Sequence, residues 1–300
     1  MMETNAIPAI RSCGLTKRFG RAVALDGLDF SVEAGQVVGL LGRNGAGKST
    51  LLRIISGQIR QTAGKAELFG STIKTAALSH LCLIGDTPDF AGLKNAAEFL
   101  AVCRGLFPSW QQEQADRLIP LFGLSLKKAL KGYSRGMQTA LLLCAGLASG
   151  AELTIFDEPG LGLDAVMRER FYDAVLELHR REPERTFLIS THLIDEVART
   201  LDYAVMIDSG RLLAQGAPEE LTRLYLCVSG EASEVRAATE GLADLRDEEV
   251  AGSLVRYVRL RTPEDAERIH NCGHVQTGPV SLQRLFVFLT GEKEAERNAI

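Results

Sequence analysis

The sequence lacks the features that would mark a metal-binding, disulfide-rich or repeat protein. None of its six cysteines forms a CxxC pair and its five histidines are scattered, so the spacing of a zinc site is absent. In a chain of 300 residues we expect these cysteines to be isolated apolar residues in a reducing compartment. No internal repeat of ~20–50 residues is evident, which argues against solenoid and propeller architectures.

Long apolar runs and an excess of basic residues are also missing. The longest apolar run, ALLLCAGLA at 140–148, has about half of the ~20 residues that a helix needs to cross a bilayer. The first residues hold no apolar core of the kind found in a secretory signal, so we expect none. The formal net charge is −4, without the basic cluster typical of nucleic-acid binding. We therefore expect neither a membrane span nor a nucleic-acid partner.

The chain does contain an alternation of strand-like and helix-like segments. Continuous apolar runs favour parallel strands that are buried on both faces, and they occur at 153–157, 186–191 and 203–208. Further strands are predicted within 9–41 and at 67–70 and 80–85. Helices are predicted at 48–56, 95–105, 111–122, 136–148, 165–180 and 193–200. This alternation predicts an α/β layer fold with a largely parallel sheet.

One internal segment departs from the alternation. Residues 93–150 carry no good strand candidate, so we predict a helical insertion and a helical subdomain over about 87–150. The residues on either side of it keep the strand and helix alternation. We therefore assign the insertion to one large domain that spans 1–225.

The end of the chain differs in composition from the rest. After about residue 225 the sequence becomes polar and acidic, and 253–260 then alternates as a half-exposed strand does. A helix is predicted to begin at Thr262, a capping residue that is followed by proline and acids. Another helix is predicted at 281–291. We predict a small α+β domain over 226–300.

The strongest chemical motif is GRNGAGKST at 42–50, which fits the phosphate-binding pattern G-x-x-x-x-G-K-[ST]. It lies between an apolar strand and a predicted helix, as the motif requires. Backbone N–H groups in such a loop point at phosphate oxygens, and the helix N-terminus adds its dipole. The residues expected to bind nucleotide are Gly42, Asn44, Gly45, Ala46, Gly47, Lys48, Ser49 and Thr50.

Three side chains of this loop have distinct expected roles. The Lys48 ammonium can reach the β- and γ-phosphates, the Ser49 hydroxyl can ligate Mg²⁺, and the Thr50 hydroxyl can bind a phosphate oxygen. The predicted cofactors are therefore ATP and Mg²⁺.

A pair of acids ends the predicted strand at 153–157, at the sheet edge where ligands bind α/β folds. We expect Asp157 to hold Mg²⁺ and Glu158 to accept a proton from an attacking water. His192 follows the strand at 186–191 at the same edge. Adjacent acids can form a solvated turn, and a lone histidine is commonly structural. The nearby phosphate-binding loop favours the site interpretation for all three residues.

The order of these motifs resembles the ATP-binding subunit of an ATP-binding-cassette (ABC) transporter over about the first 225 residues. KGYSRGMQ at 131–138 resembles the family signature in its YSxGM form, which is similar to that of the export-type subfamily whose permeases are separate chains. GLGLD at 160–164 resembles the D-loop, and STHLIDEV at 190–197 resembles the segment with the switch histidine. Phe19 falls where the family stacks an aromatic ring on adenine.

The resemblance implies a P-loop cassette with a mixed core sheet, an N-terminal antiparallel β subdomain and an ATPase activity. It implies that Ser134 and Gly136 bind the γ-phosphate of an ATP held by a second ATPase subunit, which gives a head-to-tail homodimer. Asp164 would then cross the dimer interface, and His192 would sense the γ-phosphate. A transmembrane permease is the implied partner. It would dock on the helical subdomain and hold the chain at the cytoplasmic face of the cell membrane.

Asp86 departs from the family pattern, which usually has glutamine and sometimes glutamate where this strand ends. The residue precedes Thr87 and Pro88, so a turn is the simpler interpretation. Its place at the same sheet edge as Lys48 and Glu158 favours a catalytic and Mg²⁺-facing role, since carboxylate oxygens suit that ion. Because aspartate is one methylene shorter than glutamate, contact through a water is part of this hypothesis.

Three other functions stay open at this point. A soluble ABC ATPase of translation or DNA usually carries two cassettes, zinc pairs or long coiled-coil insertions, and none of these is evident. A P-loop kinase would leave the signature and His192 unexplained. An ATP-binding regulator without turnover would not need the intact set of Lys48, Asp157 and Glu158. No motif identifies the cargo, and export is expected from the subfamily resemblance alone.

Overall fold

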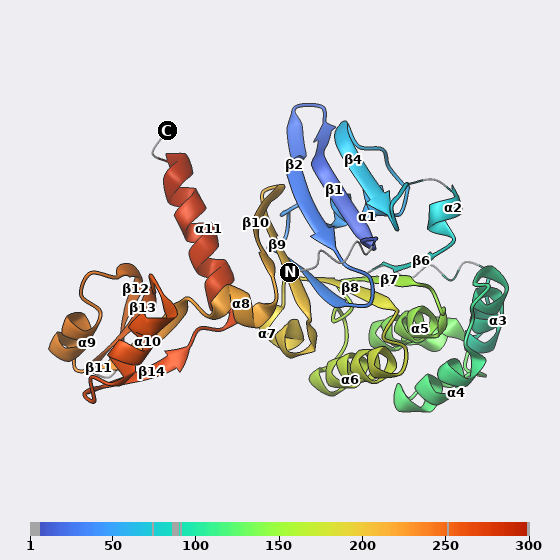
Figure 1. Cartoon of the computed structure of the whole chain (residues 1–300). Coiled ribbons are helices and arrows are strands. Elements are labelled where there is room, and N and C mark those ends of the chain that lie inside the picture. Colours follow the sequence, from blue (N-terminus) through green and yellow to red (C-terminus); the bar gives the residue numbers. More distant parts are fainter. Residues whose placement is uncertain (1–6, 74, 86–89, 91, 251, 299–300) are drawn as a thin grey trace.

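A six-stranded sheet forms the centre of the molecule (Figure 1). The structure is a computed structural model and describes residues 7–73, 75–85, 90, 92–250 and 252–298. The strand order is β10-β9-β3-β8-β7-β6, and all neighbours except β10 and β9 run parallel. The strands are β3 (Val37–Leu41), β6 (Leu81–Ile84), β7 (Leu153–Asp157), β8 (Thr186–Thr191), β9 (Tyr203–Asp208) and β10 (Arg211–Gly216).

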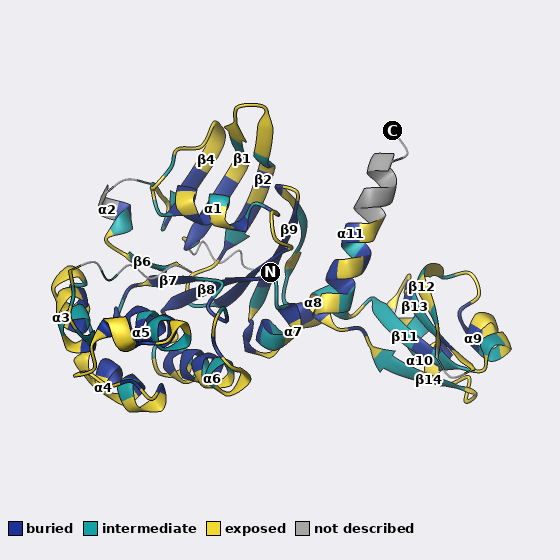
Figure 2. Ribbon diagram, turned by 180° about the vertical axis from the view of Figure 1, so that it is seen from behind, coloured by how far each residue is buried: buried dark blue, intermediate teal, exposed yellow. Residues whose placement is uncertain are grey.

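The three continuous apolar runs are confirmed as β7, β8 and β9, with the predicted bounds. Every residue of β8 is buried, as is every residue of β3 beside it. Figure 2 shows this central sheet as the most deeply buried part of the fold. The predicted α/β class with a mixed, largely parallel core sheet is therefore confirmed.

A second, antiparallel sheet covers one face of the central sheet, in the order β2-β1-β4-β5. Its strands are β1 (Ile10–Phe19), β2 (Ala22–Val32), β4 (Ala63–Leu68) and β5 (Ser71–Thr72). Helix α1 (Lys48–Ile55) packs Leu51, Leu52 and Ile54 into the core between the two sheets. The implied N-terminal antiparallel subdomain is thus present.

The strand predicted at 67–70 is placed wrongly by several residues, because β4 already ends at Leu68. Phe69 and Gly70 have φ values of 47° and 71° and form the tight turn to β5. Left-handed residues of this kind interrupt a strand.

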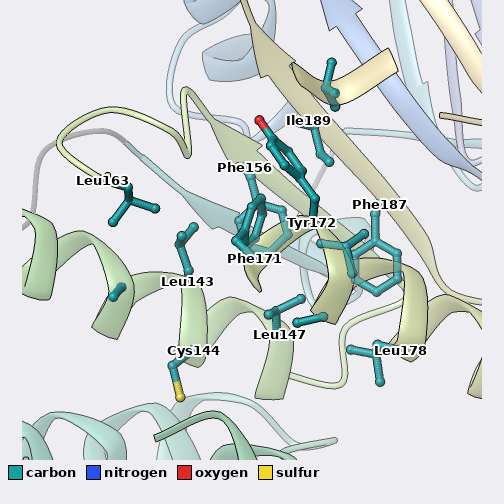
Figure 3. Packing of buried hydrophobic residues seen from close by; sticks show 14 of the residues in the cluster. Leu143, Cys144, Leu147, Phe156, Leu163, Phe171, Tyr172, Leu178, Phe187 and Ile189 are labelled. Carbon is teal, nitrogen blue, oxygen red and sulfur yellow. The ribbon is translucent and has the colours of Figure 1, made fainter. Parts of the chain in front are cut away.

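Helices cover the opposite face of the central sheet. They are α3 (Ala96–Leu106), α4 (Gln112–Leu121), α5 (Arg135–Ala148), α6 (Ala165–Arg181), α7 (Ile194–Val197) and α8 (Pro218–Thr222), with 3₁₀ turns η1 (Leu130–Gly132) and η2 (Ala198–Thr200). The short helix α2 (Thr75–Leu78) lies instead on the side of the antiparallel sheet, where Ala77 joins the core between the two sheets (Figure 1). Phe171 of α6 packs edge-on against Phe156 of β7, with ring centroids 5.0 Å apart (Figure 3). No described strand lies within 93–150, as predicted for the helical insertion.

The last part of the chain forms a third sheet, antiparallel and ordered β12-β13-β11-β14. Its elements are β11 (Tyr225–Gly230), α9 (Ala232–Ala238), β12 (Ala243–Val250), β13 (Ser253–Arg259), α10 (Pro263–His270) and β14 (Val275–Pro279). Val235 of α9 and Ile269 of α10 pack on Val228 and Val258 and give this sheet a core of its own.

Helix α11 (Leu282–Asn298) extends beyond the predicted 281–291 and joins the third sheet to the rest of the fold. Leu282, Leu285 and Phe286 belong to the large core beneath the central sheet. On the other side, Phe288 packs against Tyr257 of β13, with ring centroids 5.3 Å apart. Within the described residues, no helix is both long and apolar enough to cross a membrane.

Candidate nucleotide-binding site

The phosphate-binding loop connects β3 to α1, as the sequence motif predicts. Gly45 and Gly47 have φ values of 83° and 106°, which L side chains rarely adopt. A Cβ added at Gly47 would lie 2.6 Å from the carbonyl oxygen of Ala24, and one at Gly42 would lie 2.6 Å from that of Ile207. The loop can therefore follow this path only because both positions are glycine.

A pocket of about 350 Å³ opens beside this loop. Its walls are residues of the loop from Arg43 to Thr50, together with Glu158, Leu161 and His192. β3, β7 and β8 are adjacent and parallel in the sheet, so their carboxyl ends meet at one edge. This edge brings together residues that lie more than a hundred positions apart in the sequence.

Lys48 is buried at the centre of the pocket, with 5% of its side chain exposed. Its Nζ donates hydrogen bonds to the carbonyl oxygens of Gly42 at 2.7 Å and Arg43 at 3.3 Å. Nζ also lies 3.2 Å from Oε1 of Glu158. Two of the three donors of the ammonium group therefore bond to the backbone of the loop, and the carboxylate of Glu158 lies at ion-pair distance.

Glu158 is held in place from several sides. Its backbone has φ 50°, and its N–H donates to the carbonyl of Ser190 at 2.8 Å. Its Oε2 accepts a hydrogen bond from the Thr191 hydroxyl at 3.3 Å and lies 2.9 Å from Nδ1 of His192. A positive φ outside glycine costs free energy, so the surrounding contacts must maintain it. The carboxylate is therefore fixed between a lysine and a histidine.

Asp157 lies one residue earlier, at the end of β7. Its Oδ1 accepts a hydrogen bond from the Ser190 hydroxyl at 2.8 Å. The Ser49 side chain is exposed at the pocket wall, where its hydroxyl is accessible to a ligand. A serine hydroxyl, one carboxylate and substrate phosphates are the donor set typical of protein-bound Mg²⁺. The described residues contain no group of three or more His, Cys, Asp or Glu side chains that could hold a metal by themselves.

The predicted site residues of the signature, the D-loop and β1 do not line this pocket. Ser134 caps α5 by accepting a hydrogen bond from the Met137 N–H at 3.3 Å, and Asp164 caps α6 by accepting from Met167 at 2.8 Å. Gly136 is packed so closely that an added Cβ would lie 2.7 Å from the carbonyl oxygen of Gly162.

The signature and the D-loop are therefore in contact within one subunit, away from Lys48. Phe19 is 52% exposed at the end of β1, with the Lys17 ammonium 4.9 Å from its ring centroid. Asp86, the remaining predicted site residue, lies outside the described residues.

The comparison with known proteins agrees with this geometry. A family model described as "ABC transporter" matches residues 25–160. The daunorubicin/doxorubicin resistance ATP-binding protein of Streptomyces peucetius is 32% identical, over 99% of this chain and 97% of its own length. The chain belongs to the ATP-binding proteins of ABC transporters. Members of this family are ATPases coupled to transport, and their domain binds ATP.

A second relative and a solved structure are also similar to this chain. The Nod factor export ATP-binding protein of Ralstonia nicotianae is 31% identical and covers 95% of each chain. A solved ATP-binding subunit of an ABC transporter superimposes with a TM-score of 0.64 at 25% identity. It covers 71% of this chain and 91% of its own. The first two relatives match almost the whole ABC ATPase, so the similarity extends beyond the cassette.

Sequence reasoning missed one pair that supports the loop of the ABC ATPase. Arg43 Nε lies 3.1 Å from Oδ1 of Asp208, whose side chain is buried at the end of β9. The Gly210 N–H, just beyond, donates to the carbonyl of Ala46 at 2.9 Å. The signal was available: 203–208 ends in aspartate at the same sheet edge where 153–157 ends in aspartate.

Proposed function

We propose that the ABC ATPase hydrolyses MgATP in a head-to-tail homodimer and thereby drives a separate permease in export. The observation that carries the proposal is the cluster of Lys48, Glu158 and His192 in one pocket. These residues combine a phosphate-binding cation, a carboxylate base and a histidine in contact with that base. The names of the relatives, which refer to resistance and export, support the direction of transport.

In the proposed mechanism, the γ-phosphate replaces Glu158 as the partner of Lys48. The released carboxylate of Glu158 then accepts a proton from the attacking water as the water oxygen bonds to the γ-phosphorus and the bond to ADP breaks. His192 and Thr191 keep the carboxylate oriented, since both contact its Oε2. Ser49 and Asp157 would hold Mg²⁺, which neutralises charge on the phosphate oxygens.

The proposed dimer is supported by residues that lie outside the subunit's own pocket. Ser134 and Gly136 lie at the start of α5, where the first N–H groups of the helix have no partner within it. Such a helix end is suited to an anion. We place these groups against the γ-phosphate of an ATP bound to a second copy, with Asp164 at the interface and Phe19 against adenine.

The permease would dock on the helical subdomain. A groove of about 700 Å³ there is lined by Phe90, Leu93, Leu130 and Lys131, among others. A groove with both apolar and basic walls is suited to a helix from a partner protein. This docking would hold the ABC ATPase at the cytoplasmic face of the membrane. We retain 1–225 as the ATP-binding domain and 226–300 as a smaller domain of the same subunit.

Mixing two inactive variants tests whether the signature acts across the dimer. Lys48→Ala removes the phosphate-binding cation, and Ser134→Arg places a bulky side chain at an exposed position of the signature. A heterodimer of the two keeps one complete site if Ser134 serves the other subunit's ATP. An equimolar mixture should then recover up to about a quarter of the wild-type sites, since half of the dimers are mixed.

ATPase assays on each variant and on the mixture provide the measurement. Recovery in the mixture supports the composite site, and light scattering with and without MgATP reports the accompanying dimer. A mixture no more active than its components, with exchange of subunits verified, would show that the signature does not act in trans.

A further inference from the structure

Arg168, in the first turns of α6, contacts two motifs at once. Its NH1 group donates a hydrogen bond to the carbonyl of Leu163 in the D-loop, at 3.1 Å. Its aliphatic stem lies against Gly160, where an added Cβ would be 3.0 Å from the Arg168 Cδ. Its Nε lies 2.9 Å from Oε2 of Glu196. This last contact is an ion pair without the geometry of a directed hydrogen bond.

Glu196 connects Arg168 to the switch histidine. It lies on α7, the short helix that begins two residues after His192. His192 in turn lies 2.9 Å from the carboxylate of Glu158. A single guanidinium therefore joins the D-loop to the segment that carries the histidine of the catalytic pocket. The planar fork of arginine suits this role, since it can bind two oxygens in different directions.

The inner faces of α6 and α7 pack into one core, but a groove separates their outer edges. A groove of about 380 Å³ is lined by Arg168, Tyr172, Glu196 and Arg199, among others. The buried Tyr172 hydroxyl has no hydrogen-bond partner among the described residues, and it points away from the Phe171 ring (Figure 3). Across this groove the charged side chains of α6 face those of α7 and η2, and the Arg168–Glu196 ion pair is the less exposed link between them.

We infer that Arg168 is a positioning residue that makes the D-loop and the segment of His192 move as one unit. The inference rests on the proposed function, because the D-loop contacts a second subunit only within a dimer. Closure of the dimer would then be transmitted through Leu163, Arg168 and Glu196 to His192 and the base. Without the bridge, ATP still binds at the loop of Lys48, but the base is oriented less often.

The chain offers a matched control for this bridge. Arg199 of η2 lies 3.3 Å from Glu169 of α6, so this ion pair joins the same two regions. Its side chains are 67% and 60% exposed, compared with 26% and 36% for Arg168 and Glu196. Among the described residues, neither side chain of this control pair has a hydrogen bond or ion pair with the D-loop. Exposed ion pairs of this kind contribute little to the stability of a fold.

The test compares steady-state ATP hydrolysis by the full-length Arg168→Ala and Arg199→Ala variants. We expect Arg168→Ala to lower kcat by about five- to tenfold with KM for ATP unchanged within about twofold, the usual size of such coupling. Arg199→Ala should leave both values within about twofold of wild type. Arg168→Lys should retain only part of the activity, because its ammonium can keep one of the two contacts but not both. In the double variant with Glu196→Ala, the two losses should not add.

Hydrogen–deuterium exchange on the nucleotide-free protein provides a readout that does not depend on turnover. Exchange should rise over both 160–164 and 190–197 in Arg168→Ala, with no rise over 160–164 in Arg199→Ala. Equal kcat in the two variants, additive losses with Glu196→Ala, or unchanged exchange at either segment would overturn the inference. Absence of ATP hydrolysis by the wild-type chain would contradict the proposed function instead, and the exchange result would still decide the role of Arg168.

Discussion

Glu158→Gln should change catalysis and nucleotide affinity in opposite directions. Glutamine keeps the shape of the side chain and an oxygen that can accept from Thr191, but it cannot take a proton from water. Loss of a general base typically lowers the rate by about 10²–10⁴-fold, and we expect a decrease in kcat of this size.

The affinity change follows from the surroundings of Lys48. The Lys48 and Glu158 side chains are only 5% and 14% exposed, and their charged atoms are 3.2 Å apart. Removing one partner of a buried ion pair costs about 3–5 kcal/mol when the other charge is left alone. Here Lys48 keeps the carbonyl oxygens of Gly42 and Arg43, so we expect a cost of about 1–2 kcal/mol in the nucleotide-free state.

ATP should cancel that cost, because its phosphate becomes the partner of Lys48. The affinity of Glu158→Gln for ATP should therefore rise by about five- to thirtyfold, the equivalent of 1–2 kcal/mol. Thermal unfolding with increasing MgATP measures this affinity. Without nucleotide the variant should have a lower Tm than wild type, and its Tm should rise more as MgATP is added. Weaker ATP binding, or turnover near the wild-type rate, would refute the roles given to Lys48 and Glu158.

Three further substitutions or modifications test other parts of the fold. Gly47→Ala should abolish measurable ATP binding and destabilise the fold by about 1–3 kcal/mol, because the loop has φ 106° there and the added Cβ would meet the carbonyl of Ala24; ATP titration and thermal unfolding measure the two effects. Phe171→Ala should cost about 3–5 kcal/mol in urea unfolding, since its ring is fully buried against Phe156, and a cost below 1 kcal/mol would show that the helical layer is loosely packed. Burial raises the pKa of the Cys82 thiol to about 12, so iodoacetamide at pH 8 should modify the exposed Cys13 and leave Cys82 intact in the native protein; mass spectrometry of the peptides decides this.

Much of the fold is predictable because its signals are local. The runs at 153–157, 186–191 and 203–208 are strands with those bounds, since continuous apolar sequence between polar residues or turns leaves little choice of conformation. The prediction for 67–70 failed because the turn at Phe69 and Gly70 depends on two left-handed residues, one of them not glycine. The helix at 281–291 was expected, but its attachment to the large core was not.

The candidate site divides in the same way. The sequence alone identifies the loop around Lys48, because a phosphate-binding loop needs glycines and a lysine at set spacing within one short segment. Tertiary packing is responsible for the neighbours of that loop. Glu158 and His192 reach the pocket of Lys48 only because β8 and β7 follow β3 in the sheet, an order unrelated to chain order.

Tertiary packing also explains the contacts that no sequence motif predicts. The Arg43–Asp208 pair and the Arg168 bridge each join segments whose distance along the chain carries no information about their distance in space. The conformation of a short segment depends mainly on its own residues, so the loop of Lys48 can be predicted from the sequence alone. Contacts between segments depend on which strands pair and which helix covers which face, and these follow from burial of the whole apolar surface at once.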